Sequence, residues 1–280
     1  MDNELDRKIA WSIRFLQSIP NDKPIEIAYS GGKDSDVILE LAKMARINYR
    51  AIYKNTTIDP PGTIAHVMRA GAEIFRPRES FFHLMCRKGL PSRNARYCCE
   101  VLKEYKILDR VILGVRRCES QKRRERYVMP EICRVYSKKD KSKNARQYFP
   151  ILEWSNKDVA EFIAMRDIEC HHLYYDDLGN FHPERRLGCM CCPLASKKHR
   201  LSEFMEFPNM VKSYCRSMGI YWDNHPNSNM RSYLSNVYEW FVMQLFCDSK
   251  QEFNERFGEN LFYHRVNCKS YLESYFNIKF

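Results

Sequence analysis

The sequence lacks the features that would place the protein in a membrane or outside the cell. It has no uninterrupted run of about 18 apolar residues, the length needed to cross a bilayer, so no membrane contact is expected. Its first residues carry charges where a secretory signal has an apolar core. These charged residues are Asp2, Glu4, Asp6, Arg7 and Lys8. We therefore expect a cytoplasmic protein.

Disulfides are also not expected, although cysteine is abundant. The chain has 12 cysteines in 280 residues, and thiols stay reduced in the cytoplasm. Clustered cysteines in such a protein are more often metal ligands or catalytic groups than disulfides. Cysteines that lie among apolar residues are predicted to be core side chains, namely Cys86, Cys170, Cys215 and Cys247.

Positive charge is concentrated in one stretch of the chain. The formal net charge is +11, and residues 116–146 contain 12 Lys or Arg against 4 Asp or Glu, a local net charge of +8. The segment 117–146 shows little periodicity and is predicted to be a long irregular insertion. Such a concentration favours a polyanionic partner, either nucleotide phosphates or a nucleic-acid backbone. The alternative is a solvated loop.

A short strand, a glycine turn and a helix follow one another near the N-terminus. Ile25, Ile27 and Tyr29 alternate as in a strand, and apolar residues recur at helical spacing from Val37 to Met44. The turn between them consists of Ser30, Gly31, Gly32, Lys33, Asp34 and Ser35. Glycines let the backbone approach an anion, and the start of a helix offers N–H donors. The turn is therefore a predicted phosphate site without Walker A spacing; the alternative is an ordinary turn with a capping residue.

Strands and helices alternate through the first two thirds of the chain. Strands are predicted at 49–53, 73–75 and 111–115, and helices at 4–19, 61–69, 79–89, 96–103 and from Ser155 onward. This alternation predicts an α/β fold with a doubly wound, mainly parallel sheet, which binds ligands beyond the carboxyl ends of its strands. Candidate ligand-binding residues after such strand ends are Asp59, Gly114, Arg116, Glu119 and Arg123. Residues 1–194 are predicted to form this domain, and residues 195–280 a helical C-terminal region.

Two pairs of cysteines can form a four-sulfur site. Cys98 and Cys99 are adjacent, and Cys189 and Cys192 have two residues between them. Structural zinc sites use cysteine pairs that are separated by a few residues, whereas adjacent thiolates can bind different irons of a larger cluster. A [4Fe–4S] cluster, a zinc ion and unliganded thiols are the three alternatives. Cys191 is a spare thiol that could replace one of the four.

Further motifs occur in a fixed order after the glycine turn. Cys98-Cys99 is followed by Gly-x-Arg-x-x-Glu-Ser-x-x-Arg from Gly114, by Trp154 and Asp158, and by Arg-x-Gly-Cys-x-x-Cys-Pro from Arg186. With this combination, residues 25–195 resemble the PP-loop ATP pyrophosphatase and phosphoadenosine phosphosulfate (PAPS) reductase family. The segment 56–61 is similar to the branch that includes the sulfur-transfer components of DNA phosphorothioation systems.

The resemblance implies an adenine nucleotide alpha hydrolase-like fold that holds ATP, PAPS or adenylyl sulfate by its phosphates at the glycine turn. It also implies a [4Fe–4S] cluster on Cys98, Cys99, Cys189 and Cys192. The chain departs from the sulfonucleotide reductases of the family, which carry a tail nucleophile in the sequence Glu-Cys-Gly-Leu-His. Its last cysteine, Cys268, lies in Val-Asn-Cys-Lys-Ser-Tyr and is expected to be a structural thiol.

The leading hypothesis is an ATP pyrophosphatase that adenylates an acceptor for sulfur transfer. Lys33, Arg116 and Arg123 would neutralise the leaving pyrophosphate, and Asp34 with Asp59 would hold Mg²⁺. A nucleic acid bound by the basic segment 116–146 is the expected acceptor, and a cysteine desulfurase the expected sulfur donor. The alternatives are a sulfonucleotide reductase or transferase, and a non-catalytic nucleotide-binding redox subunit.

Three positions also have a purely structural interpretation. Asp59 precedes two prolines and is a typical turn residue. Glu119 suits an ion pair that orients Arg116. His171 and His172 complete no Cys/His ligand spacing, so they are expected to be surface residues or hydrogen-bonded polar residues.

Overall fold

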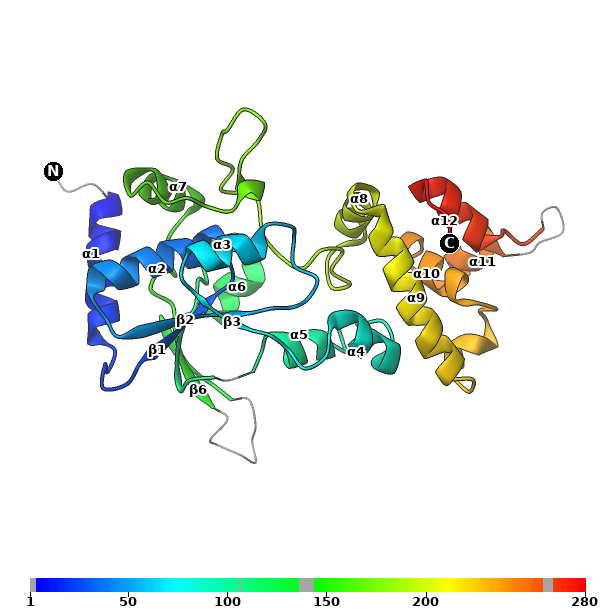
Figure 1. Ribbon diagram of the computed structural model, residues 1–280, viewed down its shortest axis with the longest axis horizontal. Helices are drawn as coiled ribbons and strands as arrows, with labels where there is room; N and C mark the ends of the chain where they lie inside the picture. Colours follow the sequence, from blue (N-terminus) through cyan, green and yellow to red (C-terminus); the bar gives the residue numbers. More distant parts are fainter. Residues whose placement is uncertain (1–3, 106, 136–143, 259–263) are drawn as a thin grey trace. The chain divides into compact units, whose positions relative to one another are not determined.

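The computed structural model describes residues 4–105, 107–135, 144–258 and 264–280 (Figure 1). The chain divides into two compact units. The first contains Met1–Pro77 and Leu102–Gly188, and the second contains Arg78–Val101 and Cys189–Phe280. In the part of the chain that is described, no helix is long and apolar enough to cross a membrane.

A six-stranded sheet forms the centre of the first unit. Its strands are β1 (Ile25–Tyr29), β2 (Tyr49–Lys54), β3 (Glu73–Phe75), β4 (Arg110–Ile112), β5 (Glu131–Arg134) and β6 (Ala145–Tyr148). The order is β3-β2-β1-β4-β6-β5, and every pair is parallel except β5 with β6. The predicted α/β fold with a mainly parallel sheet is therefore confirmed.

Strand β1 lies in the middle of this sheet and is buried on both faces. Ile25, Ile27 and Tyr29 are at most 2% exposed, and Ile27 lies opposite both Ala51 of β2 and Ile112 of β4. Burial on both faces is typical of parallel strands that are covered by helices. The glycine turn follows β1 directly, so it lies at the carboxyl edge of the sheet.

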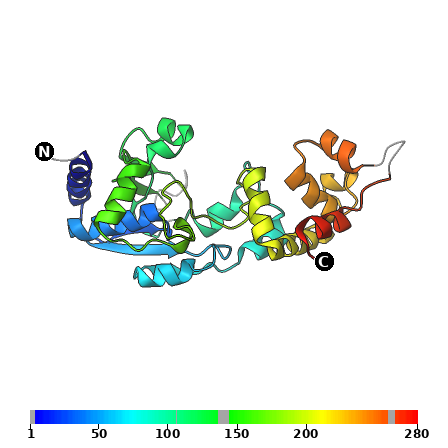
Figure 2. The same ribbon diagram turned by 90° about the horizontal axis from the view of Figure 1, so that it is seen from above.

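Helices flank the sheet. They are α1 (Glu4–Ser18), α2 (Lys33–Ala45), α3 (Thr63–Arg69), α6 (Gln121–Arg126) and α7 (Asn156–Met165), with the 3₁₀ turns η1 (Arg117–Glu119) and η3 (His172–Tyr174). Helices α1 and α7 both contact α2 (Figure 1 and Figure 2). Ser155 caps α7 as predicted, because its hydroxyl accepts from Asp158 N while the Asp158 carboxylate accepts from Ser155 N.

The basic segment 117–146 is more regular than we predicted. Its described part contains η1, α6, β5 and β6, and β6 pairs with β4 inside the sheet. The expectation of an irregular insertion is therefore wrong there, while residues 136–143 lie outside the described residues. Pattern analysis missed these elements because α6 is a short polar helix and β6 is a four-residue strand with Arg146 and the buried polar Gln147 at its centre.

The second unit is helical. Its helices are α4 (Phe81–Lys88), α5 (Tyr97–Leu102), α8 (Lys197–Glu206), α9 (Pro208–Asn224), α10 (Val237–Phe246), α11 (Lys250–Phe257) and α12 (Cys268–Phe276), with the 3₁₀ turn η4 (Asn229–Ser232). Helix α4 contacts α9, although more than 100 residues separate them in sequence. Tyr214 of α9 is in ring contact with Phe81, Phe204 and Phe241, which form an aromatic core. The predicted helical C-terminal region is confirmed.

Candidate nucleotide-binding site and cysteine site

The glycine turn between β1 and α2 is held by its own hydrogen bonds. Gly31 has a φ of +74°, a conformation that L side chains rarely adopt. The Ser35 hydroxyl donates to Gly32 O at 2.7 Å and accepts from Ser30 N at 3.2 Å. Helix α2 then begins at Lys33 with no side-chain cap. The turn is thus rigid, and the first N–H groups of α2 have no capping side chain.

Tyr174 packs against this turn. A Cβ atom on Gly32 would lie 3.1 Å from the Tyr174 hydroxyl, and that hydroxyl accepts from Leu187 N at 3.2 Å. The ammonium of Lys33 lies 5.1 Å from the centre of the Tyr174 ring. The close approach of Tyr174 in η3 therefore requires glycine at position 32, and the Tyr174 ring packs against the Lys33 ammonium.

Lys33 is a buried cation at the start of α2. Its side chain is 2% exposed, and Nζ lies 3.4 Å from Asp34 Oδ2 and 3.1 Å from the carbonyl oxygen of Arg185. Burial lowers the pKa of Lys33, an effect that Asp34 opposes. A phosphate group would supply the negative charge that this environment lacks.

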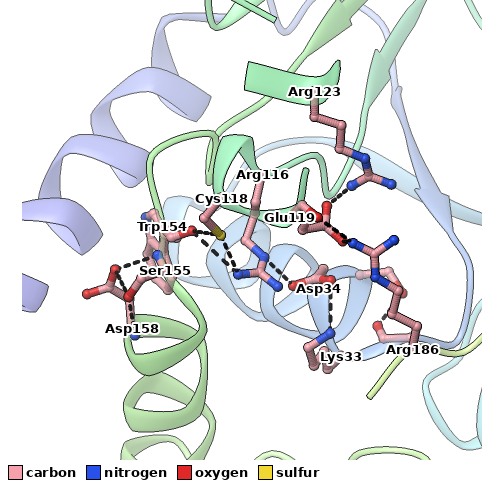
Figure 3. A network of polar contacts seen from close by, with 12 residues as sticks. Lys33, Asp34, Arg116, Cys118, Glu119, Arg123, Trp154, Ser155, Asp158 and Arg186 are labelled. Atoms are coloured by element: carbon pink, nitrogen blue, oxygen red, sulfur yellow. Dashed lines mark hydrogen bonds and ion pairs between the residues drawn. The ribbon is translucent and has the colours of Figure 1, made fainter. Parts of the chain in front are cut away.

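Arg116 is the second buried cation, and it shares Asp34 with Lys33. Its side chain is 1% exposed, and Nε lies 2.8 Å from Asp34 Oδ1. Nη1 contacts Cys118 Sγ at 3.2 Å and the carbonyl oxygen of Trp154 at 3.5 Å. Figure 3 shows Asp34 between the two cations. One carboxylate thus orients two positive groups at the first turn of α2.

Gly114 makes this arrangement sterically feasible. A Cβ atom there would lie 3.0 Å from Asp34 Cβ and 3.2 Å from its backbone carbonyl atoms. The chain leaving β4 therefore touches the first turn of α2, and this contact brings Arg116 to Asp34.

A second ion-pair group contains two more arginines. Glu119, whose side chain is 8% exposed, pairs with Arg123 and lies 3.4 Å from Arg186. Arg186 also donates to the Glu119 carbonyl oxygen at 2.9 Å (Figure 3). Burial lowers the pKa of Arg123, and the nearby Arg186 lowers it further. Glu119 therefore pairs with these two arginines, not with Arg116 as in its structural interpretation.

A buried polar layer lies behind the turn. Asp36 of α2 accepts a hydrogen bond from the Tyr29 hydroxyl and lies 3.1 Å from His66 Nε2. Burial raises the pKa of Asp36, while His66 and Tyr29 oppose the rise. His171 contacts Thr63 Oγ1 at 3.3 Å and is fully buried. These groups fix α2 to β1, α3 and the chain before η3.

Most of the residues predicted at this site lie together, and one does not. Ser30–Ser35, Gly114 and Arg116 form one connected group, and Glu119 pairs with Arg123. Asp59 instead accepts from Thr56 N at 2.8 Å. No interaction recorded among the described residues joins it to the turn, so its structural interpretation as a turn residue describes it better.

Sequence reasoning missed four contributors to the site. They are Tyr174, the Arg185 carbonyl oxygen, Arg186 and Cys118. Arg186 opens the Arg-x-Gly-Cys motif, so its motif position was a usable signal. Tyr174 and the Arg185 carbonyl oxygen reach Lys33 over long sequence separations, which no residue pattern reveals. Cys118 contacts Arg116 from only two residues away, but no recognised motif marks it.

The four predicted cysteine ligands all lie in the second unit. Cys98 and Cys99 are on α5, and Cys189 and Cys192 are in the turn before α8. Interaction with Cys99, burial and the charge of Cys192 together raise the pKa of Cys98. The two cysteine pairs therefore influence each other. Over the described residues, no three His, Cys, Asp or Glu side chains are grouped as ligands for a metal ion.

Cys191 and Tyr214 shape the surroundings of this cysteine site. Cys191 is fully buried with a φ of +50°, and its carbonyl oxygen accepts from the Tyr214 hydroxyl at 2.7 Å. Burial, followed by the charges of Cys191, Cys192 and Cys189, raises the pKa of Tyr214. The aromatic core of the second unit thus fixes the turn that carries the cysteines.

Comparison with known families identifies the class of protein. The strand, glycine turn and helix define a nucleotide-binding PP-loop protein. Residues 24–195 match the phosphoadenosine phosphosulfate reductase domain. Because the match covers more than half of the chain, the protein belongs to the phosphoadenosine phosphosulfate reductase domain family.

Curated relatives of the chain are longer proteins. An uncharacterized protein of Methanocaldococcus jannaschii is 31% identical over 204 residues, which cover 68% of this chain and 46% of that protein. An uncharacterized 37.8 kDa protein of Escherichia phage 186 is 28% identical over 154 residues, covering 50% of this chain and 42% of that protein. The chain spans less than half the length of these relatives.

Two solved structures are similar in part. A phosphoadenylyl-sulfate reductase from Candida auris in a phosphate complex has 18% identity and a TM-score of 0.45, covering 68% of this chain and 96% of that one. An FMN adenylyltransferase from Candida glabrata has 14% identity and a TM-score of 0.42, covering 61% of this chain and 58% of that one.

Proposed function

We propose that the protein is an ATP pyrophosphatase that adenylates an acceptor for sulfur transfer. The observation that carries this proposal is the pair of buried cations, Lys33 and Arg116, held by Asp34 at the uncapped start of α2. Buried positive charge beside a helix start and a glycine turn suits the β- and γ-phosphates of ATP. Family membership supports an enzyme of this nucleotide-using type.

The proposed reaction has two balanced steps. An acceptor oxygen attacks the α-phosphorus of ATP, the bond from that phosphorus to the bridging oxygen breaks, and pyrophosphate leaves. A sulfur nucleophile then displaces AMP from the adenylated acceptor. Lys33 and Arg116 would stabilise the charge that develops on the leaving pyrophosphate, and Arg123 would do so after exchanging its pairing with Glu119 for a phosphate.

The residues expected to hold Mg²⁺ do not fit that ion well. Both carboxylate oxygens of Asp34 face cations, and Asp59 accepts from a backbone N–H group. Magnesium prefers carboxylate oxygens free to complete an octahedron with waters and phosphates. The two proposed steps therefore use no protein-bound magnesium.

The four cysteines have the donor chemistry of the proposed [4Fe–4S] cluster, but over the described residues no three of them are grouped as ligands for a metal ion. Cys98, Cys99, Cys189 and Cys192 provide four soft ligands within one compact unit. Zinc is the alternative occupant of the same residues. When bound, the cluster would supply a redox-active centre suited to sulfur chemistry.

Sulfonucleotide reduction is the second candidate, favoured by the family match itself. It lacks an evident nucleophile, because Cys268 is 3% exposed at the start of α12 and burial raises its pKa to about 12. A thiol with such a pKa is almost entirely protonated near neutral pH, so it is a poor nucleophile.

The acceptor is proposed from the charge pattern, and the sulfur donor from the family branch that segment 56–61 resembles. Exposed cations on α6 include Lys122, Arg124 and Arg126, which would meet the backbone of a nucleic-acid acceptor. A cysteine desulfurase in the cytoplasm would supply the sulfur, as in the DNA phosphorothioation branch that segment 56–61 resembles.

The experiment that separates the candidates offers anaerobically purified protein ATP with nucleic acids, or PAPS with a thiol reductant. Pyrophosphate release that depends on nucleic acid supports the proposal. Sulfite release that survives in Cys268→Ser supports the reductase activity without a tail nucleophile. Nucleotide binding with neither product indicates a non-catalytic subunit.

A further inference from the structure

Glu119 is a nearly buried carboxylate that lies between two arginines from distant parts of the chain (Figure 3). Its side chain is 8% exposed, and it pairs with Arg123 and, at 3.4 Å, with Arg186. The side chains of the two arginines are 36% and 58% exposed. The carboxylate is therefore enclosed by the protein, while both arginine side chains keep access to solvent.

The backbone holds Glu119 in place more firmly than its side chain holds Arg186. Glu119 ends η1, and the next residue, Ser120, caps α6 by accepting from Arg123 N at 3.2 Å. Arg186 Nη2 donates to the Glu119 carbonyl oxygen at 2.9 Å, whereas its contact with the carboxylate is longer than the roughly 2.7–2.9 Å of a charge-assisted hydrogen bond. Arg186 is thus anchored on a backbone oxygen, and its charge is only loosely paired.

This arginine pair is connected to the cations at the glycine turn. The carbonyl oxygen of Arg185 accepts from Lys33 Nζ at 3.1 Å, and the side chain of the next residue, Arg186, reaches Glu119. Burial lowers the pKa of Lys33, and the charges of Arg116 and Arg186 lower it further. The two groups of charges are therefore close enough to act on one ligand.

Positive charge exceeds negative charge in the combined group. Four cations face two carboxylates, which leaves a net charge of +2; the cations are Lys33, Arg116, Arg123 and Arg186, and the carboxylates are Asp34 and Glu119. A phosphate group offers more acceptor oxygens than a carboxylate, and the planar fork of a guanidinium matches its geometry. A phosphate can therefore replace the Glu119 carboxylate as the partner of both arginines.

We infer that Arg123 and Arg186 form a second phosphate subsite, and that the Glu119 carboxylate occupies it until a phosphate of the nucleotide takes its place. The inference rests on the nucleotide of the proposed function. Binding exchanges ion pairs and changes no covalent bond: the two arginines turn from Glu119 to the phosphate, and Glu119 remains enclosed. Glu119 therefore competes with the nucleotide and weakens its binding, although it lies within the site.

The test is calorimetric titration of ATP into full-length wild type, Glu119→Gln and Glu125→Gln, with folding confirmed by circular dichroism. Glu119→Gln should bind ATP about two- to fivefold more tightly, because the competing ion pairs are lost. A carboxylate needed to build the site would give weaker binding instead. Glu125→Gln is the matched control, because it removes the same charge from an exposed position on α6 that accepts from Gln121 at 2.9 Å. Its affinity should stay close to that of the wild type.

A second variant tests the arginine that has no part in the proposed reaction. Arg186→Gln should lose about tenfold in ATP affinity, and Arg186→Lys should recover part of the loss because it restores the charge. Adding Glu119→Gln to Arg186→Gln should give a smaller gain than Glu119→Gln gives alone, since one of the two arginines that bind both anions is missing.

The outcomes separate this inference from the proposed function. ATP binding that is unchanged or weaker in Glu119→Gln overturns the inference and leaves the proposed function in place. A gain for a short single-stranded oligonucleotide, but not for ATP, overturns the assignment of the subsite to the nucleotide. Tighter ATP binding in Glu119→Gln, with no pyrophosphate release by the wild type, supports the subsite and overturns the proposed function. Wild-type protein that does not bind ATP overturns both. If Glu119→Gln does not fold, an unchanged affinity in Arg186→Gln contradicts the inference.

Discussion

At the scale of single residues, the contact between β4 and the first turn of α2 depends on glycine at position 114, which has no side chain. Gly114→Ala would place a Cβ atom 3.0 Å from Asp34 Cβ, and overpacking of this kind destabilises by about 1–3 kcal/mol. We expect a lower melting temperature and weaker ATP binding, because the first turn of α2 must move. Gly188→Ala is the control, since a Cβ atom there meets nothing within 4 Å. Equal melting temperatures and affinities in the two variants would contradict this account.

His171 gives the first unit a pH-dependent stability. Burial, with a smaller effect of His172, lowers the pKa of His171 from 6.5 to about 4. Between these values the unfolded chain binds a proton that the folded chain does not, so stability is lost as pH falls from about 6.5 to about 4. The loss amounts to about 3 kcal/mol at most. Thermal melts of wild type and His171→Gln at pH 7 and pH 4.5 should show a smaller pH effect in the variant.

The control for this titration is an exposed histidine. His83→Gln removes a solvent-exposed imidazole on α4 and should reproduce the wild-type pH dependence. A His171→Gln variant that loses stability in acid as steeply as the wild type would show that another group is responsible.

At the scale of elements, neighbouring strands contain a buried and an exposed ion pair that can be compared. Glu26 of β1 is fully buried, lies 2.9 Å from Lys54 Nζ of β2, and accepts from Leu108 N. Removing one partner of a buried pair is unfavourable by about 3–5 kcal/mol, because the other charge stays buried. Glu26→Ala should therefore lower the melting temperature of the first unit strongly.

The exposed pair joins the next two strands. Arg50 of β2 and Glu73 of β3 lie 2.6 Å apart with side chains that are 38% and 45% exposed. Such pairs contribute about 1 kcal/mol or less, so Glu73→Ala should melt within a few degrees of the wild type. Similar losses in Glu26→Ala and Glu73→Ala would mean that burial does not govern the first pair.

Elements that depend on local patterns could be predicted from the sequence, and those that depend on distant pairing could not. The alternation of Ile25, Ile27 and Tyr29, the two glycines and the periodic residues after them lie within one segment, so β1, the turn and α2 were predicted. Strand β6 has a polar pattern and acquires its place from β4, over 30 residues earlier. Tyr174 likewise acquires its role only when the chain folds back onto Lys33.

At the scale of the whole molecule, the two predicted chemistries belong to different compact units. Lys33, Asp34 and Arg116 lie in the first unit, and the four predicted cysteine ligands lie in the second. The sequence predicted both groups of residues. It did not predict that residues 78–101 join the C-terminal helices, because this depends on the contact between α4 and α9.

This division predicts which segments become more flexible when iron is removed. Removing the proposed cluster with a chelator should increase hydrogen exchange in α5 and in residues 189–200, because their sulfur ligands lose a common partner. Exchange in β1 and β2 should stay unchanged, as measured by mass spectrometry. An increase confined to the first unit would contradict the assignment of the metal to these cysteines.

The central claim is that Arg116 and Lys33 bind the pyrophosphate part of ATP. Its most direct test is calorimetric titration of ATP into wild type, Arg116→Gln and Arg117→Gln, with folding confirmed by circular dichroism. Arg116 is buried against Asp34, whereas its neighbour Arg117 is 33% exposed and pairs with Glu153. We predict about a tenfold or greater loss of affinity in Arg116→Gln and an almost unchanged affinity in Arg117→Gln. Equal affinities in all three proteins would contradict the account.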